Sequence, residues 1–285
     1  MRQFLHKTLV LLSLLTVSCQ QNNKQSTAPK ATEENNPFKN KSDSTTIDLG
    51  ALQKQGLFKK TAVVTVNDDP VYHGIKHYNA VPLSELLAKY TNIKSLESAK
   101  YQIVFECADG YKPMMPLRQF LYVKSYIAVS DTDAPKGKPW ITIIKNGQKT
   151  NPAPFYLIYE NVSVKDENFK WPYNILKIHI VPNNKNVELL FPKEGKKAQL
   201  GFELFKKNCI SCHAINKVGG TMGPELNYPK SVTEYWDQKQ LKAFIKNPAS
   251  FRNGVKMPTL NNLTAKDIES IVAYLNYMTS HKKED

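Results

Sequence analysis

The sequence predicts a multidomain protein in which an α+β middle domain precedes a smaller, all-α C-terminal domain. Three observations carry this prediction. The chain has 285 residues, which is enough for about two domains. Short apolar runs broken by turn residues dominate residues 47–192, a pattern typical of strands. From residue 198 the apolar residues recur at helical spacing instead.

The chain is basic, and its charge bears on the classes of partner it can have. It carries 39 Lys and Arg against 25 Asp and Glu, a net charge of +14. Only Arg2, Arg118 and Arg252 are arginine, whereas proteins that read bases rely on bidentate arginine contacts. We therefore expect no nucleic-acid partner. We expect a basic surface that attracts acidic redox proteins or lies near anionic lipid.

Residues 1–18 are predicted to be a signal peptide. A short basic segment precedes an apolar run at residues 9–17, which is too short to span a bilayer. Thr16-Val17-Ser18-Cys19 resembles a bacterial lipobox, although Thr16 stands where leucine is usual. The resemblance implies that Cys19 is lipidated and anchors the mature chain to a membrane. An ordinary secretory signal is the alternative, and both interpretations export the chain to the periplasm or cell envelope.

Residues 19–46 are predicted to form a flexible tether. They are rich in Gln, Asn, Lys, Ser and Thr, and Phe38 is almost their only large apolar residue. Such a segment buries too little apolar surface to offset the entropy of ordering. At random-coil scaling, about 25 residues reach roughly 25–30 Å.

The middle domain, residues 47–192, should contain several strands and one main helix. A helix is expected at residues 81–90, where Leu83, Leu86, Leu87 and Tyr90 share one face. The strands are expected at residues 62–66, 101–106, 126–129, 141–144, 155–159 and 175–181. Three histidines lie in this region. His73 and His77 are expected in a loop or strand with surface or structural roles, and His179 on a half-exposed strand.

Part of the middle domain resembles the oxidoreductase molybdopterin-binding, or sulfite-oxidase-like, fold. The residues concerned are Val81-Pro82-Leu83-Ser84-Glu85-Leu86-Leu87, then Asp109-Gly110-Tyr111, then Pro116-Leu117. In catalytic members a cysteine thiolate ligates molybdenum, and Cys107 is the one candidate here. Catalytic members also use several basic side chains to hold the pterin phosphate. This region offers only Arg118 and scattered lysines. The domain is therefore expected to lack a cofactor, with Cys107 as a buried apolar residue at a strand end.

The C-terminal domain, residues 196–281, contains Cys209-Ile210-Ser211-Cys212-His213. This C-x-x-C-H pattern is the attachment signal of c-type haem. Each cysteine sulfur can add to one porphyrin vinyl group, and the adjacent histidine can ligate the iron. A bare C-x-x-C could instead be a disulfide, half a zinc site or a redox dithiol. A zinc site would need two further ligands, and the other cysteines, Cys19 and Cys107, stand alone.

Around this motif the sequence resembles the class I cytochromes c over about 90 residues. The matching features are Gly201 and Phe205 before the motif, Gly223-Pro224-Glu225-Leu226 after it, Lys256-Met257-Pro258, and Tyr274-Leu275 near the end. The resemblance implies that the first helix crosses the last at Gly201. It also implies that the Pro224 carbonyl orients His213 and that Met257 is the second axial ligand.

Three further expectations concern the elements around these features. Met222 is the rival ligand, but it lies close in sequence to His213. A helix is expected at residues 236–247, with Trp236 either near a haem propionate or in the core. The last helix should start at Thr264, where Asp267 approximates a capping box.

The sequence thus predicts an exported, lipid-anchored protein with one covalent haem c that transfers single electrons between envelope proteins. The middle domain would dock a partner or ligand, so an electron carrier is favoured over an enzyme. One alternative is a haem-coupled dehydrogenase with molybdenum or another metal in the middle domain. Another is a sensor in which haem serves structure. The sequence names neither the electron donor nor the acceptor.

Overall fold

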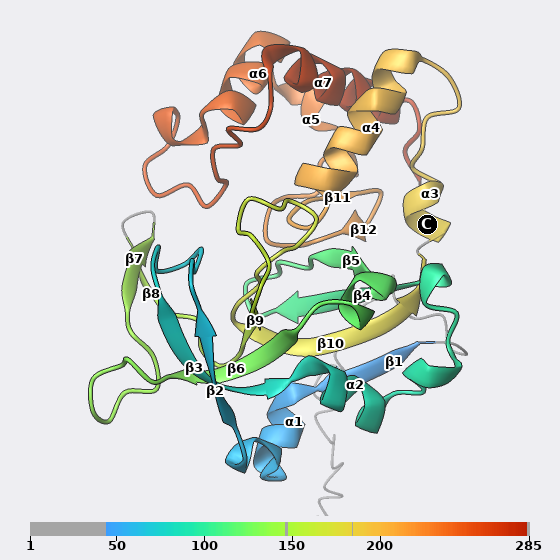
Figure 1. Cartoon of the computed structure of the whole chain (residues 1–285). Helices are drawn as coiled ribbons and strands as arrows, with labels where there is room; N and C mark the ends of the chain where they lie inside the picture. The colour runs from blue at the N-terminus through green and yellow to red at the C-terminus, as the bar shows by residue number, and fades with distance from the viewer. Residues whose placement is uncertain (1–43, 146–147, 184, 284–285) are drawn as a thin grey trace, which may run out of the picture. The chain divides into compact units, whose positions relative to one another are not determined.

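The computed structural model describes residues 44–145, 148–183 and 185–283. They belong to one compact unit, residues 37–285 (Figure 1). The predicted signal peptide, Cys19 and almost all of the predicted tether lie outside the described residues. The first strand begins at Thr45, two residues inside the range expected for the tether.

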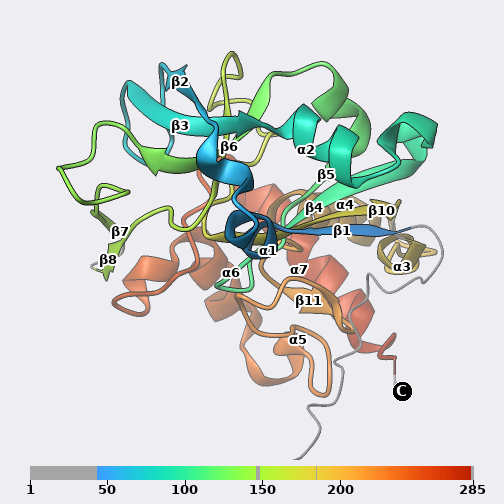
Figure 2. The same cartoon turned by 90° about the horizontal axis from the view of Figure 1, so that it is seen from below.

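Two four-stranded antiparallel sheets organise the N-terminal two thirds (Figures 1 and 2). The first has the order β1 (Thr45–Asp48), β10 (Ile175–Pro182), β4 (Tyr101–Cys107) and β5 (Met114–Pro116). The second has the order β2 (Ala62–Val66), β3 (Lys76–Pro82), β6 (Ser125–Asp131) and β9 (Tyr156–Tyr159). A separate hairpin pairs β7 (Ile143–Lys145) with β8 (Gln148–Thr150). The sheets together with the helices confirm a mixed fold.

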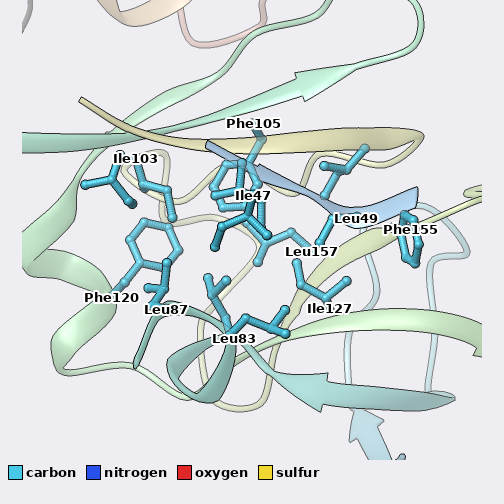
Figure 3. Packing of buried hydrophobic residues seen from close by; sticks show 14 of the residues in the cluster. Ile47, Leu49, Leu83, Leu87, Ile103, Phe105, Phe120, Ile127, Phe155 and Leu157 are labelled. Carbon is cyan, nitrogen blue, oxygen red and sulfur yellow. The ribbon is translucent and has the colours of Figure 1, made fainter. Parts of the chain in front are cut away.

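The main core contains side chains from both four-stranded sheets and from the short helices (Figure 3). Pairing places Ile47 opposite Ile178 and Ile178 opposite Phe105, so three neighbouring strands present a row of buried apolar groups. Ile127 and Leu157 contribute from the other sheet. The helical elements of this region are α1 (Leu49–Lys54), α2 (Leu83–Tyr90), η1 (Leu57–Lys59), η2 (Ile93–Ser95), η3 (Ser98–Lys100) and η4 (Leu117–Leu121).

The strand expected at residues 62–66 coincides with β2, but β3 was not expected. Its residues Lys76, His77 and Asn79 make its sequence look like a loop. In the structure Lys76 is buried, and its Nζ lies 2.8 Å from Asp131 on the neighbouring strand. The helix expected from residue 81 starts at Leu83, because Val81 and Pro82 still belong to β3.

His179 was expected to be half-exposed, and that expectation is wrong. It is 5% exposed, because β10 has a neighbouring strand on each side. Its Nδ1 lies 2.9 Å from the Thr46 hydroxyl, and its Nε2 lies 3.0 Å from the Glu106 carboxylate. His77 lies on β3 beside Asp133, at 3.1 Å, in agreement with a structural role.

The C-terminal part is mainly helical. It comprises α3 (Lys185–Glu188), α4 (Lys196–Asn208), α5 (Val232–Tyr235), α6 (Gln238–Lys246), η5 (Pro248–Ser250) and α7 (Ala265–Thr279). It also contains a short antiparallel pair, β11 (Ala214–Ile215) and β12 (Val218–Gly219). The expectation of an all-α domain is therefore not confirmed.

Helices α4 and α7 cross at Gly201. A Cβ there would overlap the backbone carbonyl of Ser270, so only glycine allows this close approach. Phe202 and Phe205 pack on Tyr274, with ring centroids 5.6 and 5.4 Å apart. Both helices were expected, and the capping box between Thr264 and Asp267 is present.

The helix expected at residues 236–247 starts later than that, at Gln238. Asp237 is its N-cap, and its side chain accepts hydrogen bonds from Lys239 N and Gln240 N. Trp236 precedes this helix as the C-cap of α5 and packs on Phe244, with ring centroids 5.1 Å apart.

Two backbone hydrogen bonds join the turn after β4 to the loop after α4. Lys112 N donates to Ser211 O at 2.9 Å, and Thr221 N donates to Gly110 O at 3.1 Å. Gly110 has a φ of +85°, and a Cβ there would lie 2.7 Å from the Thr221 hydroxyl. A separate ion pair of 2.5 Å joins Lys207 on α4 to Glu167, in the segment between β9 and β10. The two backbone hydrogen bonds join residues of the predicted middle domain to the loop that carries the C-x-x-C-H motif.

Candidate haem-attachment site

The C-x-x-C-H segment is a turn at the end of α4. Cys209 N donates to Phe205 O at 2.8 Å, which closes the helix. Cys212 N and His213 N both donate to Cys209 O, at 3.0 and 2.9 Å. The two cysteines and the histidine are thus held on one tight turn, which is what attachment to adjacent edges of one planar ring requires.

Neither Cys209 nor Cys212 forms a disulfide among the described residues. Burial is the largest cause that raises the pKa of Cys209, to about 12, and that of Cys212, to about 11. Redox dithiols have a lowered thiol pKa instead. Among the described residues no group of three or more His, Cys, Asp or Glu side chains could hold a metal ion. The disulfide, zinc and redox-dithiol alternatives therefore find no support here.

The imidazole of His213 has a defined orientation. Its Nδ1 lies 2.8 Å from the carbonyl oxygen of Pro224. Because a carbonyl only accepts, Nδ1 must carry the hydrogen, which leaves the lone pair of Nε2 available to a metal. Burial lowers the pKa of His213, which favours the neutral, ligating form.

Three glycines enclose this turn from the other side of the loop. A Cβ on Gly223 would overlap the His213 ring, and Cβ atoms on Gly219 and Gly220 would overlap the backbone of His213 and Ser211. Gly223 N also donates to Cys212 O at 2.8 Å. The sequence analysis missed Gly219 and Gly220, although Gly-Gly seven residues after Cys212 signals a close backbone approach.

Glu225 has a role that the sequence analysis missed, although the residue was named there as part of the segment around Pro224. Its Oε1 accepts from the backbone N of Asn216, Asn227 and Tyr228, and its Oε2 accepts from Lys217 N at 2.9 Å. The carboxylate thereby holds β11, the following turn and the Pro224 segment together. The position of Glu225 directly after Pro224 was the signal in the sequence that could have indicated this role.

The two candidate methionines have different surroundings. Met257 is partly buried and packs against the same apolar cluster as Cys209 and Leu226. Met222 lines a cavity together with Asp109 and Tyr111. Its backbone N would lie 2.9 Å from a Cβ on Gly110, so it faces the turn after β4.

The donor set fits haem c. It combines two thiols, one neutral imidazole of fixed tautomer and a soft thioether beside an apolar cluster that contains Val232, Leu241 and Ile245. Thioether bonds to both cysteines and axial ligation by a nitrogen and a sulfur match the known chemistry of this cofactor.

Cys107 does not fit a metal-ligating role. It ends β4, is 3% exposed and belongs to the main apolar core. Burial raises the pKa of its thiol well above the usual range, so the thiolate that molybdenum needs is disfavoured. Arg118 lies on η4.

Cys19, the residue predicted to be lipidated, lies outside the described residues. Within the described ranges, no helix is both long and apolar enough to cross a membrane.

Comparisons with known proteins concern the C-terminal part. The family model described as cytochrome C oxidase, cbb3-type, subunit III matches residues 196–275. The cytochrome c of Theileria annulata is 31% identical in an alignment 104 residues long, which covers 30% of this chain and 90% of that protein.

Two other relatives are matched over a smaller share of their length. A cytochrome c homolog of Rickettsia prowazekii is 33% identical in an alignment 100 residues long, which covers 28% of this chain and 57% of that protein. Cytochrome c oxidase subunit 2 of Alkalihalophilus pseudofirmus is 32% identical in an alignment 84 residues long, which covers 27% of this chain and 25% of that protein. The chain therefore spans a quarter of one relative and just over half of the other.

Proposed function

Because this chain belongs to the cytochrome c family through its C-terminal part, we propose that it is an exported carrier of single electrons whose haem iron is ligated by His213 and Met257. Covalently attached haem c is the cofactor that membership of this family implies. When bound, it supplies a one-electron Fe(II)/Fe(III) couple. The redox partners are other proteins of the cell envelope.

The hydrogen bond from His213 to Pro224 carries this proposal. It fixes the ring so that Nε2 is the ligating atom, and it makes the imidazole a stronger donor. Cys209 and Cys212 would hold the porphyrin through their sulfurs. Met257 would supply a neutral sulfur ligand to the iron, which would raise the reduction potential relative to two imidazoles.

A pair of methionine variants tests the ligand assignment. In Met257→Ala, the reduction potential and the low-spin reduced spectrum should both change, because the second axial ligand is lost. Met222→Ala removes the same side chain from the cavity beside Asp109 and should leave both unchanged. If Met222→Ala changed the spectrum while Met257→Ala did not, the assignment would be wrong.

We assign residues 47–192 to recognition, as a docking domain for a partner or ligand. The burial of Cys107 argues against a second redox centre there. Metal analysis of the purified full-length protein should find one iron per chain. Molybdenum or copper in equal amount would make the protein a haem-coupled dehydrogenase instead.

We also propose that Cys19 carries a lipid anchor and that the mature protein lies outside the cytoplasm. The lipobox-like residues before Cys19 and the need to attach haem c outside the cytoplasmic membrane support this. Wild-type protein should partition into detergent, and Cys19→Ser should remain in the aqueous phase. Equal partitioning of the two proteins would exclude the anchor.

A further inference from the structure

The turn after β4 holds the haem-attachment loop from the side of the middle domain (Figure 1). Lys112 N donates to Ser211 O, which lies between the two cysteines of the motif, and Thr221 N donates to Gly110 O. Because Gly110 has no Cβ, its backbone can approach Thr221 and Met222 at a distance that a side chain would prevent. The middle domain thus contacts the attachment segment itself.

The same turn is held in place by hydrogen bonds of its own. Gly110 N donates to Cys107 O at 3.1 Å, and Cys107 N donates to Tyr111 O at 3.0 Å. Tyr111 N donates to the Asp109 carboxylate at 3.0 Å. The side chain of Tyr111 also packs against the main apolar core. Its ring therefore has a fixed position beside the attachment loop.

A cavity of about 520 Å³ lies next to this turn, and both parts of the chain line it. The helical part contributes Cys212 and the residues on either side of Met257. A porphyrin held by these residues would therefore extend into this space, whose volume is in the range of cofactor sites. The middle domain contributes Asp109, Tyr111 and residues 170–174 to the lining.

Three aromatic side chains of the middle domain line the cavity: Tyr111, Trp171 and Tyr173. Burial is the largest cause that raises the pKa of Tyr111, and an ionised Cys212 is the second, so the phenol and this sulfur lie close together. Trp171 packs edge-on against Tyr159, with ring centroids 4.8 Å apart, which holds it in the wall. Flat rings of this kind suit contact with a planar conjugated macrocycle.

We propose that the middle domain forms one wall of the haem pocket, with Tyr111 packed against the porphyrin beside Cys212 and Trp171 next to it. Such a wall requires the proposed haem attachment. It adds to the docking role of residues 47–192, because residues about a hundred positions before the C-x-x-C-H motif would then control how much water reaches the cofactor. An electron that passes this side of the porphyrin would cross the middle domain.

The three tryptophans of the chain report on this wall in the haem-loaded full-length protein. Trp171 lies in the proposed wall, and Trp236 lies in the helical part. Trp140 is three ring contacts away from Tyr173. Low-spin Fe(III) is paramagnetic and low-spin Fe(II) is not, so NMR signals of nuclei near the iron move on oxidation. We expect the indole N–H signal of Trp171 to move strongly and that of Trp140 to move least.

The backbone amide signals of Gly110 and Lys112 are followed in the same spectra, because the angular dependence of the effect can hide one nucleus but not three. If Trp236 moved on oxidation while Trp171, Gly110 and Lys112 did not, the haem would be attached and the wall would be wrong. If no signal moved and the reduced spectrum lacked low-spin haem, the haem assignment itself would be wrong, and the wall with it.

Variants at Tyr111 give a second measurement. Tyr111→Ala would let water reach the porphyrin, which favours the more highly charged ferric state, so the reduction potential should fall. Tyr111→Phe keeps the ring and should have nearly the potential of wild type. Tyr122→Ala removes the same side chain from a position that is 87% exposed and should have no effect. Equal potentials in Tyr111→Ala and Tyr122→Ala would contradict the proposed wall.

Discussion

The imidazole of His213 donates a hydrogen bond of 2.8 Å from Nδ1 to the carbonyl oxygen of Pro224. The donor and acceptor are eleven residues apart in the sequence. The hydrogen bond from Gly223 N to Cys212 O holds the same loop at a second point. The orientation of the proposed iron ligand is therefore set by a backbone carbonyl, and the loop that carries this carbonyl is held by further hydrogen bonds.

Gly223→Ala should disturb this ligand directly. The added Cβ would overlap the His213 ring, so the imidazole must turn away from its hydrogen bond. We expect a smaller fraction of low-spin haem in reduced spectra of the variant. Gly74→Ala, where a Cβ would meet nothing within 4 Å, is the control. A normal spectrum in Gly223→Ala would show that the loop adapts.

Gly201→Ala should destabilise the crossing of α4 and α7. A Cβ there would overlap the Ser270 carbonyl, and overpacking of this kind costs about 1–3 kcal/mol. Denaturant unfolding followed by haem absorbance measures the loss. Gly50→Ala, in helix α1 with its nearest contact at 3.4 Å, should be neutral or slightly stabilising. Equal stability of the two variants would contradict this packing account.

Gly110→Ala should weaken the contact between the turn after β4 and the loop after α4. The Cβ would lie 2.7 Å from Thr221 Oγ1 and 2.9 Å from Met222 N, in a backbone conformation that already favours glycine. We expect the sheets and the helical part to unfold in separate thermal transitions. Gly137→Ala has a similar φ of +83° but no neighbour within 4 Å. Gly137→Ala therefore measures only the cost of placing alanine in this backbone conformation. If this control also unfolded in two transitions, the effect of Gly110→Ala could not be attributed to the contact.

Glu106 should make stability depend on pH. Its hydrogen bond with His179 is the largest cause that lowers the pKa of Glu106 below its usual value of 4.5. A lowered pKa in the folded state stabilises the protein above about pH 4.5, and that contribution is lost as the pH falls through the lowered value. Glu106→Gln should therefore cost about 1–2 kcal/mol at neutral pH and less in acid.

A matched control for this variant is Glu97→Gln. Glu97 pairs with Lys100 at 2.6 Å, but both side chains are about 70% exposed. Exposed pairs contribute little, so this variant should unfold at nearly the same denaturant concentration as wild type at every pH. The free energy of unfolding of Glu106→Gln is compared with that of wild type at each pH. If the difference stayed constant down to acid pH, the proposed role of the Glu106 carboxylate would be contradicted.

Local patterns predicted much of the fold. The β2 strand, the α4 and α7 helices and the capping box at Thr264 each depend on residues close together in the chain. The elements that were missed depend on distant partners. Lys76 lies on a strand because Asp131 neutralises it, and His179 is buried because Thr46 and Glu106 lie on either side of it.

The candidate site likewise contains residues that the local sequence predicts and contacts that it does not. Cys209, Cys212 and His213 are recognisable because the chemistry of attachment fixes their spacing. The contacts between Gly110 and Thr221 and between Lys112 and Ser211 join residues about a hundred positions apart. No pattern within one segment indicates such a contact, so this part of the site could not be predicted from the sequence.

The crossing of α4 and α7 also has a consequence for biogenesis. Gly201 can meet Ser270 only after residues 265–279 have been synthesised. Until then α4, which ends at the segment with Cys209 and Cys212, has no α7 to pack against. The last helix therefore completes the packing beside the proposed haem-attachment turn.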